Sequence, residues 1–281
     1  MVRKWKHAAV RTARLMCVAL VGLAAFAAGC GDGSASGTFE PATKDTLTVV
    51  TEPLPVAGFW EGTDAHPDGG LEYAIADELR ERLGLARLAI RTRPFERIAG
   101  GDLAGADVAL DLLTPTTARE KVLDFTTPYT ESPPAMVTRA GREIPDVQTA
   151  QELRWVVKRG TTFEDIIAEQ IRPDHPPMAV GTRAEVLAAL SSGSADVAMF
   201  DLPAADAIVR ADPALGVAAR LASTEPIAAA LPKDSRNTEA VGSALRAMDA
   251  DGTIDRLAER WLGASLDDSA NAAPLLRTDQ T

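Results

Sequence analysis

The sequence predicts an α/β fold of two lobes, each built on a parallel-rich sheet, with two crossings of the chain between them. Short β-rich runs alternate with helix-length segments over most of residues 46–262, as in parallel sheets that helices cover on both faces. The alternation pauses at 130–141 and at 221–232, each time with an extended segment beside proline. The expected lobes are 46–131 with 227–262, and about 140–222.

The first half of the folded region supplies the outer lobe. TLTVV (46–50) is a short β-rich run. In LEYAIADELRERLG (71–84) apolar residues recur at helical spacing before a terminal glycine, which predicts a helix and its end. RLAIRTR (87–93) and ADVALDLL (106–113) are strand candidates, and the second is apolar enough for a buried parallel strand. PAMVTRA (134–140) has the pattern of an extended crossing segment.

The second half repeats the pattern from residue 150 onward. Three strand–helix pairs are expected, at 154–160 with 161–171, 178–182 with 183–193, and 195–201 with 202–211. Extended segments follow at 216–222 and 226–232, and two helices, 237–252 and 253–263, end the folded part.

The ends of the chain have a different composition. Basic residues and the apolar stretch Leu15–Phe26 lead to AAGC at Cys30, the layout of a secretory signal and too short for a spanning helix. A retained membrane helix is the alternative. AAGC resembles the lipobox of bacterial lipoproteins, so 1–29 is expected to be a signal peptide and Cys30 the lipidated residue. We expect 30–45 to be a flexible tether and 264–281 a disordered tail.

Composition excludes several function classes. The formal net charge is −11, and residues 1–29 hold five basic and no acidic residues, so the remainder carries −16, which argues against nucleic-acid binding. Both cysteines, Cys17 and Cys30, precede the folded part, and no histidine has metal-ligand spacing. Phosphate-loop and nucleophile-elbow motifs are absent from the sequence. We therefore expect no enzyme, metal or cofactor.

A first candidate anion site lies in TPTTAREKVLDFTTPY (114–129). Thr114 can cap a helix whose first residue is Pro115. Arg119 would then lie in the first turn, where the helix dipole disfavours a cation. An anion held jointly by the free N–H groups and Arg119 would offset that penalty. The alternative is a surface arginine paired with Glu120 or Asp124.

The inserted lobe offers a second candidate in KRGTTFED (158–165). Gly160 allows close backbone approach, and Thr161 or Thr162 can cap a helix, with Thr161 and Glu164 fitting a capping box. The alternative is only a good helix start. One such site in each lobe would let a single carboxylate hold the cleft shut.

Two further residues have both a functional and a structural interpretation. Asp201 ends the strand candidate 195–201, where its carboxylate could receive an ammonium group or cap the following helix. Phe95 could be a platform for a ligand or an ordinary core residue.

Six segments occur in the order typical of one family: LTVVTE, GLEYAIADELRERLG, GADVALDLLTPTTAREKVLDFTTPY, RWVVKRGTTFEDI, EVLAALSSGSADVAMFD and DGTIDRLAERWLG. Over about 46–263 the chain resembles the polar-amino-acid type of bacterial extracellular solute-binding protein, which feeds ABC importers. The most specific segments are the Thr-x-Thr-x-x-Arg turn running into Asp-Phe-Thr-Thr-Pro-Tyr, and the Gly-Thr-Thr helix start. The resemblance implies a two-lobed, periplasmic-binding-protein-like fold with the ligand between the lobes.

The resemblance also implies ligand-binding roles. The ligand's α-carboxylate would bind Arg119, Thr114, Thr161 and Thr162. Its α-ammonium would bind Asp201 and the carbonyl of Leu112. Its side chain would pack on Phe95, with Lys158 at its far end. Glu52 matches an acidic first-strand end that in some members of the family also faces the amine. The chain departs from the family at Leu112, where glycine is common, and in its first loop, where Phe59 or Trp60 is the candidate for a missing ring.

These features favour a monomeric lipoprotein on the outer side of the cell membrane. It would deliver an amino acid, or a similar small zwitterion or carboxylate, to an ABC permease by hinge closure. One alternative is a dehydratase for cyclic acids with Glu52 as proton donor. Another is the input module of a sensor. The sequence identifies neither the ligand nor the permease.

Overall fold

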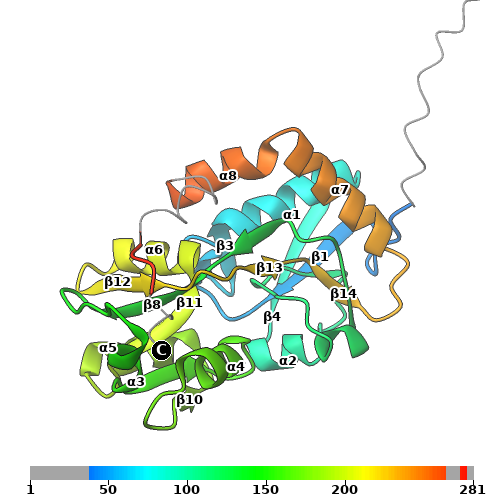
Figure 1. The fold of residues 1–281 in the computed structure, drawn as a ribbon. Coiled ribbons are helices and arrows are strands. Elements are labelled where there is room, and N and C mark those ends of the chain that lie inside the picture. Colours follow the sequence, from blue (N-terminus) through cyan, green and yellow to red (C-terminus); the bar gives the residue numbers. More distant parts are fainter. Residues whose placement is uncertain (1–37, 264–272, 277–281) are drawn as a thin grey trace, which may run out of the picture. The chain divides into compact units, whose positions relative to one another are not determined.

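The structure, a computed structural model, describes residues 38–263 and 273–276. These residues form two five-stranded sheets and two short ribbons (Figure 1). The first sheet has the order β4-β1-β5-β14-β6, with β4 (Arg87–Thr92), β1 (Thr46–Thr51), β5 (Val108–Ala109), β14 (Ala230–Pro232) and β6 (Leu123–Phe125). The second has the order β10-β9-β11-β8-β12, with β10 (Met178–Val180), β9 (Trp155–Lys158), β11 (Val197–Asp201), β8 (Pro134–Arg139) and β12 (Leu215–Arg220). The predicted signal peptide and Cys30 lie outside the described residues.

Both sheets are parallel except for one strand, which confirms the predicted two-lobed α/β fold. In the first sheet β14 runs antiparallel to β5 and β6, and in the second β8 runs antiparallel to β11 and β12. Each of these strands follows a crossing from the other lobe. All six residues of β1 are buried, as expected for an inner parallel strand.

The two crossings of the chain lie side by side. β7 (Thr130–Ser132) pairs antiparallel with β13 (Glu225–Ile227), and this ribbon joins the two lobes. The other ribbon pairs β2 (Glu61–Thr63) with β3 (His66–Gly69). We expected 134–140 to be a crossing, and this prediction was wrong. β8 is an inner strand of the second sheet, between β11 and β12. Its apolar residues Ala135, Met136 and Val137 suit this position, where they are fully buried.

Helices cover both faces of each sheet (Figure 1). The first lobe contains α1 (Leu71–Arg82), α2 (Phe95–Ala99), the 3-10 turn η1 (Arg119–Lys121), α7 (Thr238–Ala250) and α8 (Thr253–Leu262). The second contains α3 (Val147–Gln151), α4 (Phe163–Ile166), the π-helical turn η2 (Ile167–Ile171), α5 (Arg183–Ser192) and α6 (Leu202–Ala211). Val49 and Val50 of β1 belong to different core clusters because successive side chains point to opposite faces. Within the described residues no helix combines the length and apolar character needed to cross a membrane.

Residues 38–45 do not behave as the tether that we expected. The Asn237 side chain accepts from Glu40 N and donates to Glu40 O, both at 2.9 Å. Ala42 N donates to Asp107 Oδ1 at 2.7 Å, and Phe39 packs on the first lobe's core. The fold therefore begins near residue 39, and 30–37 lie outside the described residues.

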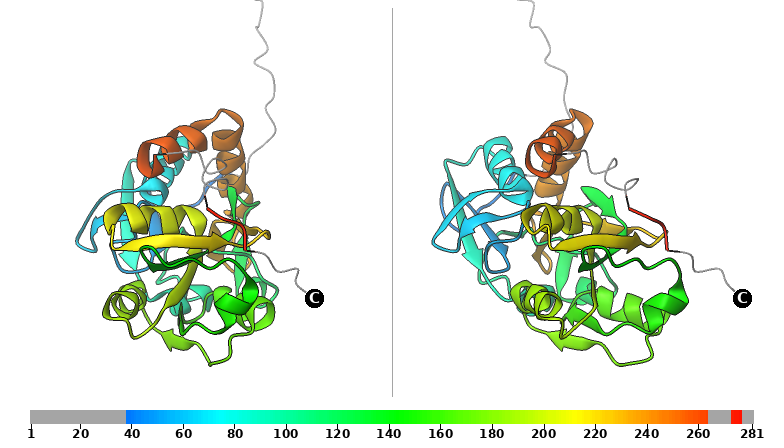
Figure 2. Two further views of the ribbon diagram at one scale, coloured as in Figure 1. Left: turned by 60° about the vertical axis from the view of Figure 1, so that its left-hand side comes forward. Right: turned by 90° about the vertical axis from the view of Figure 1, so that its left-hand side faces the viewer.

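Part of the expected disordered tail is attached to the second lobe. Residues 273–276 lie beside the outer edge of β12 (Figure 2). Arg220 N donates to Pro274 O and Leu276 N donates to Arg220 O, both at 2.8 Å. Leu276 is 2% exposed and belongs to the second lobe's core. An edge strand has free backbone groups, and this segment satisfies some of them while Leu276 covers apolar surface. Residues 264–272 and 277–281 lie outside the described residues.

We expect Leu276→Ala to lower the free energy of unfolding by about 2 kcal/mol, because it removes a buried apolar side chain. Urea unfolding at neutral pH measures the effect. Leu275→Ala is the control, because Leu275 is 49% exposed and should change stability by less than about 0.5 kcal/mol. Equal effects of the two substitutions would mean that the segment is not packed.

Candidate functional site

A cavity between the two lobes brings most of the predicted site residues together. It contains about 450 Å³ of empty space, a figure that includes open solvent at its mouth. Eight of the nine predicted ligand-binding residues line it: Phe95, Leu112, Thr114, Arg119, Lys158, Thr161, Thr162 and Asp201. The ninth, Glu52, lies beside the cavity and contacts Lys158. The carboxyl ends of parallel strands meet here, since Lys158 ends β9 and Asp201 ends β11.

Arg119 is buried rather than on the surface. It is 7% exposed, and its Nη1 donates to Thr114 O at 2.7 Å. Its Nη2 donates to Gly160 O of the other lobe at 2.9 Å. The alternative of a surface ion pair was wrong, because Asp124 pairs with Lys233 and no carboxylate of the described residues forms an ion pair with Arg119. The guanidinium is therefore a buried cation whose hydrogen bonds within the described residues go to two backbone carbonyls.

The turn before Arg119 differs from the prediction. Thr114 does not cap a helix, because the only helical residues of the segment 114–129 are the three of η1, Arg119–Lys121. Thr116 Oγ1 accepts from Arg119 N at 3.2 Å instead. The helix-dipole argument was therefore wrong. The chain from Thr114 remains non-helical, which leaves the Thr114 carbonyl free to accept from the Arg119 guanidinium.

The predicted capping box at the start of α4 was also wrong. Glu164 accepts from Gly160 N at 2.5 Å and not from Thr161 N. The Thr161 hydroxyl donates to Lys158 O at 2.7 Å, and no side chain caps the helix. The Thr162 hydroxyl donates to Glu225 Oε2 at 2.8 Å. Both threonines therefore line the cavity, and neither side chain caps α4.

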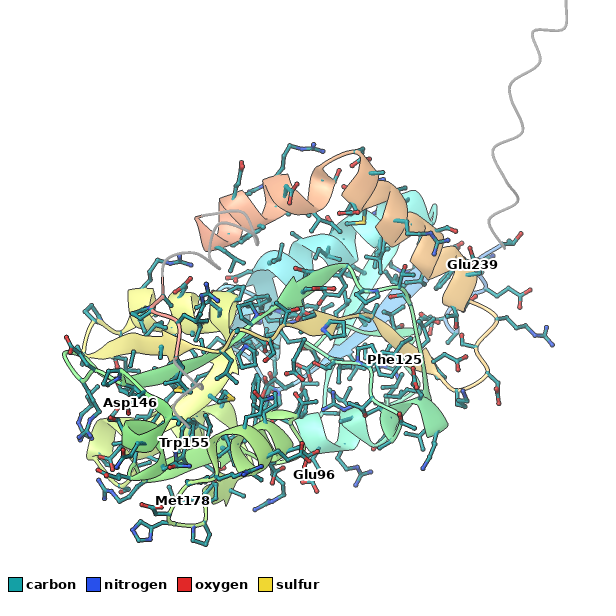
Figure 3. All side chains as sticks on the ribbon, in the orientation of Figure 1. Glu96, Phe125, Asp146, Trp155, Met178 and Glu239 are labelled. Atoms are coloured by element: carbon teal, nitrogen blue, oxygen red, sulfur yellow. The ribbon has the colours of Figure 1, made fainter. Side chains whose placement is uncertain are left out.

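Gly160 permits the close approach of the lobes. Its φ is +80°, and a Cβ at this position would lie 3.3 Å from Glu96 Cα on α2. Figure 3 labels Glu96, which lies where α2 of the first lobe approaches α4 of the second. A residue with a side chain would strain the backbone and crowd this contact.

The carboxyl group of Asp201 is buried, and few favourable contacts offset the cost of burying its charge. Asp201 is 8% exposed, and its side chain does not cap α6, so that alternative interpretation was wrong. Burial, and secondarily the charge of Glu225, raise the pKa of Asp201 to about 7. Its carboxylate lines the cavity and lacks an ion pair among the described residues. A ligand cation would supply the missing counter-charge.

Glu52 joins the lobes through two cations. Its Oε1 accepts from Lys158 Nζ at 2.8 Å and from Arg183 Nη2 at 3.0 Å. Burial alone raises the pKa of Glu52, but Lys158 and Arg183 outweigh it and lower the pKa to about 2. Lys158 Nζ also lies 4.1 Å from the centroid of the Phe95 ring, a cation–π contact. Phe95 is thus both a core residue and part of the cavity wall.

Sequence reasoning missed two charged residues of the cavity wall, Arg183 and Asp111. Arg183 opens α5, and nothing in its local pattern indicates that it reaches Glu52. Asp111 is an acidic residue inside an apolar strand candidate, which was a signal that we did not use. Its Oδ1 accepts from Thr51 Oγ1 at 3.2 Å, and its Oδ2 is buried without a partner among the described residues. Burial and the nearby Glu52 raise its pKa well above the usual range.

A buried network supports the wall at Leu112, whose φ of +49° is unusual for a residue other than glycine. Leu112 N donates to Glu72 Oε1 at 2.9 Å, and the Tyr129 hydroxyl donates to the same oxygen at 2.5 Å. Trp60 Nε1 donates to Glu72 Oε2 at 2.8 Å. These bonds hold Leu112 in place. Trp60 and Phe59 lie in the first lobe's core, and neither lines the cavity.

Comparison with known proteins agrees with this architecture. The model of the bacterial extracellular solute-binding proteins, family 3, matches residues 55–264. The L-cystine-binding protein TcyJ of Escherichia coli (strain K12) is 27% identical over 235 residues, which cover 79% of this chain and 85% of TcyJ.

Solved structures agree in fold. An ancestral arginine-binding protein with bound glutamine has a TM-score of 0.70 and 26% identity, covering 79% of this chain and 99% of its own. An amino acid ABC transporter substrate-binding protein from Streptococcus pneumoniae, bound to L-arginine, has a TM-score of 0.69 and 22% identity, covering 79% of this chain and 95% of its own. The second likeness concerns the fold alone.

We expect Tyr129→Phe to destabilise the protein by about 2 kcal/mol, because Glu72 loses one donor while it remains buried. Thermal and urea unfolding measure the effect. Tyr73→Phe is the control, because the Tyr73 hydroxyl makes no hydrogen bond within the described residues although its ring packs on Trp60. A loss no larger in Tyr129→Phe than in Tyr73→Phe would contradict the role of this network.

Proposed function

The chain belongs to family 3 of the bacterial extracellular solute-binding proteins, and from that premise we propose that it binds an amino acid between its lobes and delivers it to an ABC importer. One observation carries the proposal. A buried guanidinium, Arg119, and a buried carboxyl group, Asp201, line one cavity from opposite lobes, and neither has an ion-pair partner among the described residues. The α-carboxylate and α-ammonium of an amino acid would complete both. The relatives named for L-cystine or solved with glutamine or L-arginine support this ligand class.

The proposed binding mode follows from the free groups of the cavity wall. Arg119 would bind the α-carboxylate, with the Thr114 turn, Thr161 and Thr162 around it. Asp201 and the carbonyl of Leu112 would receive the α-ammonium. The ligand's side chain would then lie against Phe95, near Lys158 and Glu52. Charge-assisted contacts of this kind are among the strongest hydrogen bonds in proteins.

Closure of the lobes would couple binding to transport. Lys158 and Arg183 of the second lobe bind Glu52 of the first, and Arg119 reaches the Gly160 carbonyl across the same gap. The ribbon of β7 and β13 is the proposed hinge. Since a ligand stabilises the state in which it makes more contacts, one that touches both walls would shift the population toward the closed form. A permease that recognises the closed form would then receive only loaded protein.

The dehydratase alternative receives less support from the site. Its candidate proton donor, Glu52, is held as a carboxylate by two cations, and its pKa is lowered to about 2. A group with such a pKa is a poor general acid near neutral pH. The site therefore favours binding over catalysis. A sensor input module would share the same binding chemistry and would differ in its partner.

We also propose that Cys30 carries a lipid that anchors the protein outside the cell membrane. This proposal rests on the sequence AAGC, which follows a basic and then an apolar stretch at the start of the chain. Expressed in its own host, the protein should fractionate with membranes, whereas Cys30→Ser should not, because two or three acyl chains bind firmly. Mass spectrometry of the mature chain provides the check. A mature protein that starts elsewhere and carries no lipid would refute this part of the proposal.

We expect Arg119→Ala to weaken ligand binding by roughly 2–5 kcal/mol, or about thirtyfold or more in Kd, because a buried carboxylate loses its partner. A thermal-shift screen of amino acids identifies the ligand first, and calorimetry then measures Kd. Arg119→Lys should recover only part of the loss, since an ammonium makes no two-pronged contact. Arg97→Ala is the control, because Arg97 is exposed and pairs with Asp102. Parental affinity in Arg119→Ala would remove the main support for the binding mode.

We expect the affinity for an amino acid to fall as the pH falls below about 7. The ligand's ammonium favours ionised Asp201, whose pKa without ligand is about 7 because of burial and Glu225. Affinity should be constant above that pH and weaken by about tenfold per pH unit between 7 and 5. The ligand's own α-groups do not titrate in this window. Calorimetry from pH 5 to 8 tests it, and in Asp201→Asn the slope should disappear. An equal slope in this variant would assign the titration to another group, such as Glu225.

A further inference from the structure

Resting on the proposed amino-acid binding, we infer that the part of the cavity formed by Lys158, Arg183 and Asp111 binds a second carboxylate. The ligand would then be an amino acid that carries an acidic group besides its α-carboxylate. The inference goes beyond the family's shared binding of one amino-acid head group, because Arg183 lies outside the segments that carry the resemblance.

The first argument is an excess of positive charge. Glu52 binds both Lys158 and Arg183 through a single oxygen, so two cations share one carboxylate. Their side chains are 9% and 12% exposed, so water screens them little. A buried cation without full compensation is costly. Glu52 is therefore the one carboxylate in ion-pair contact with these two cations among the described residues, and it cannot neutralise both.

The second argument is that Asp111 forms no ion pair with Lys158 or Arg183 among the described residues. Its Oδ2 is buried and has no partner among the described residues. An ionised carboxylate is unfavourable when one of its oxygens is buried without a hydrogen-bond donor. Burial together with the charge of Glu52 raises the pKa of Asp111 well above the usual range. The raised pKa favours the protonated form of Asp111, in which the carboxyl group has an O–H donor.

The third argument is the balance of hydrogen-bond donors. Arg183 Nε is buried without an acceptor among the described residues, and Lys158 uses one of its three donors on Glu52. The O–H of Asp111 adds another donor. A carboxylate has only acceptors and can take several of these bonds at once, whereas a carboxamide has one acceptor oxygen and brings an NH₂ that meets like donors.

A basic ligand side chain fits this wall poorly. Lys158 Nζ lies 4.1 Å from the Phe95 ring centroid and Arg119 Cζ lies 5.5 Å from it, so two cations already contact the ring that would receive the side chain. A guanidinium or ammonium of the ligand would meet charges of its own sign. The proposed ligand class of this chain therefore differs from that of the structural neighbour solved with L-arginine.

The test compares two groups of ligands by calorimetry with the full folded protein. L-aspartate and L-glutamate carry a second carboxylate without a second cation, whereas L-asparagine, L-glutamine, L-arginine and L-cystine lack that combination. We expect the tightest ligand to come from the first group. If it is an acidic amino acid, it should bind at least tenfold more tightly than its own amide. A tightest ligand from the second group would overturn the inference and leave the proposed amino-acid binding intact. Binding of none of the six would refute the proposed function itself.

A pair of variants tests the residues. Arg183→Gln should weaken the tightest ligand by at least tenfold, because the second carboxylate loses a cation. Arg159→Gln is the matched control, because Arg159 is an exposed neighbour of Lys158 that contacts the Ala179 carbonyl. Unfolding curves establish that both variants fold, and the ligand comparison in the parent protein does not depend on them. Equal affinities in the two variants would overturn the role of Arg183.

Discussion

The two ion pairs of Glu52 are the interaction on which the site depends. Lys158 and Arg183 come from β9 and α5 of one lobe, and they meet at one oxygen at the end of β1 in the other. Removing three charged groups from water is costly, so this arrangement is favourable only while all three remain in contact. The contact also places Lys158 over Phe95 and Arg183 against Phe200. The shape of the cavity wall thus follows from an electrostatic requirement between the lobes.

Buried charged groups in this protein fall into two kinds. Glu72 accepts three hydrogen bonds from Trp60, Tyr129 and Leu112, and it serves the scaffold. Arg119, Asp111 and Asp201 are also buried, yet none of them forms an ion pair among the described residues. Buried charged groups of native proteins are usually paired, so unpaired charged groups that line one cavity indicate a ligand. The Glu72 network holds the backbone N–H of Leu112, the residue next to Asp111 in the cavity wall.

The sequence was informative where structure is local. The apolar periodicity of 71–84 and the alternation after residue 150 predicted α1 and the second lobe's elements from β9 to α6 to within a few residues. The strand expected at 106–113 was too long, because only Val108 and Ala109 pair before the chain turns through Leu112 to line the cavity. Arg183 escaped prediction because its partner Glu52 lies 131 positions away and no local pattern links them. Glu225 escaped for the same reason, since its contact with Thr162 joins the hinge ribbon to a helix start.

The attachment of residues 39–42 and 273–276 to different lobes has a practical consequence. Glu40 is hydrogen-bonded to Asn237 of the first lobe, and Leu276 is hydrogen-bonded to Arg220 of the second. A donor fluorophore fused ahead of residue 39 and an acceptor fused directly after residue 276 would each be attached to one lobe. Energy transfer between them would then vary with the angle between the lobes. The protein has the layout of a ratiometric optical reporter for its own ligand, and building one would leave the cavity untouched.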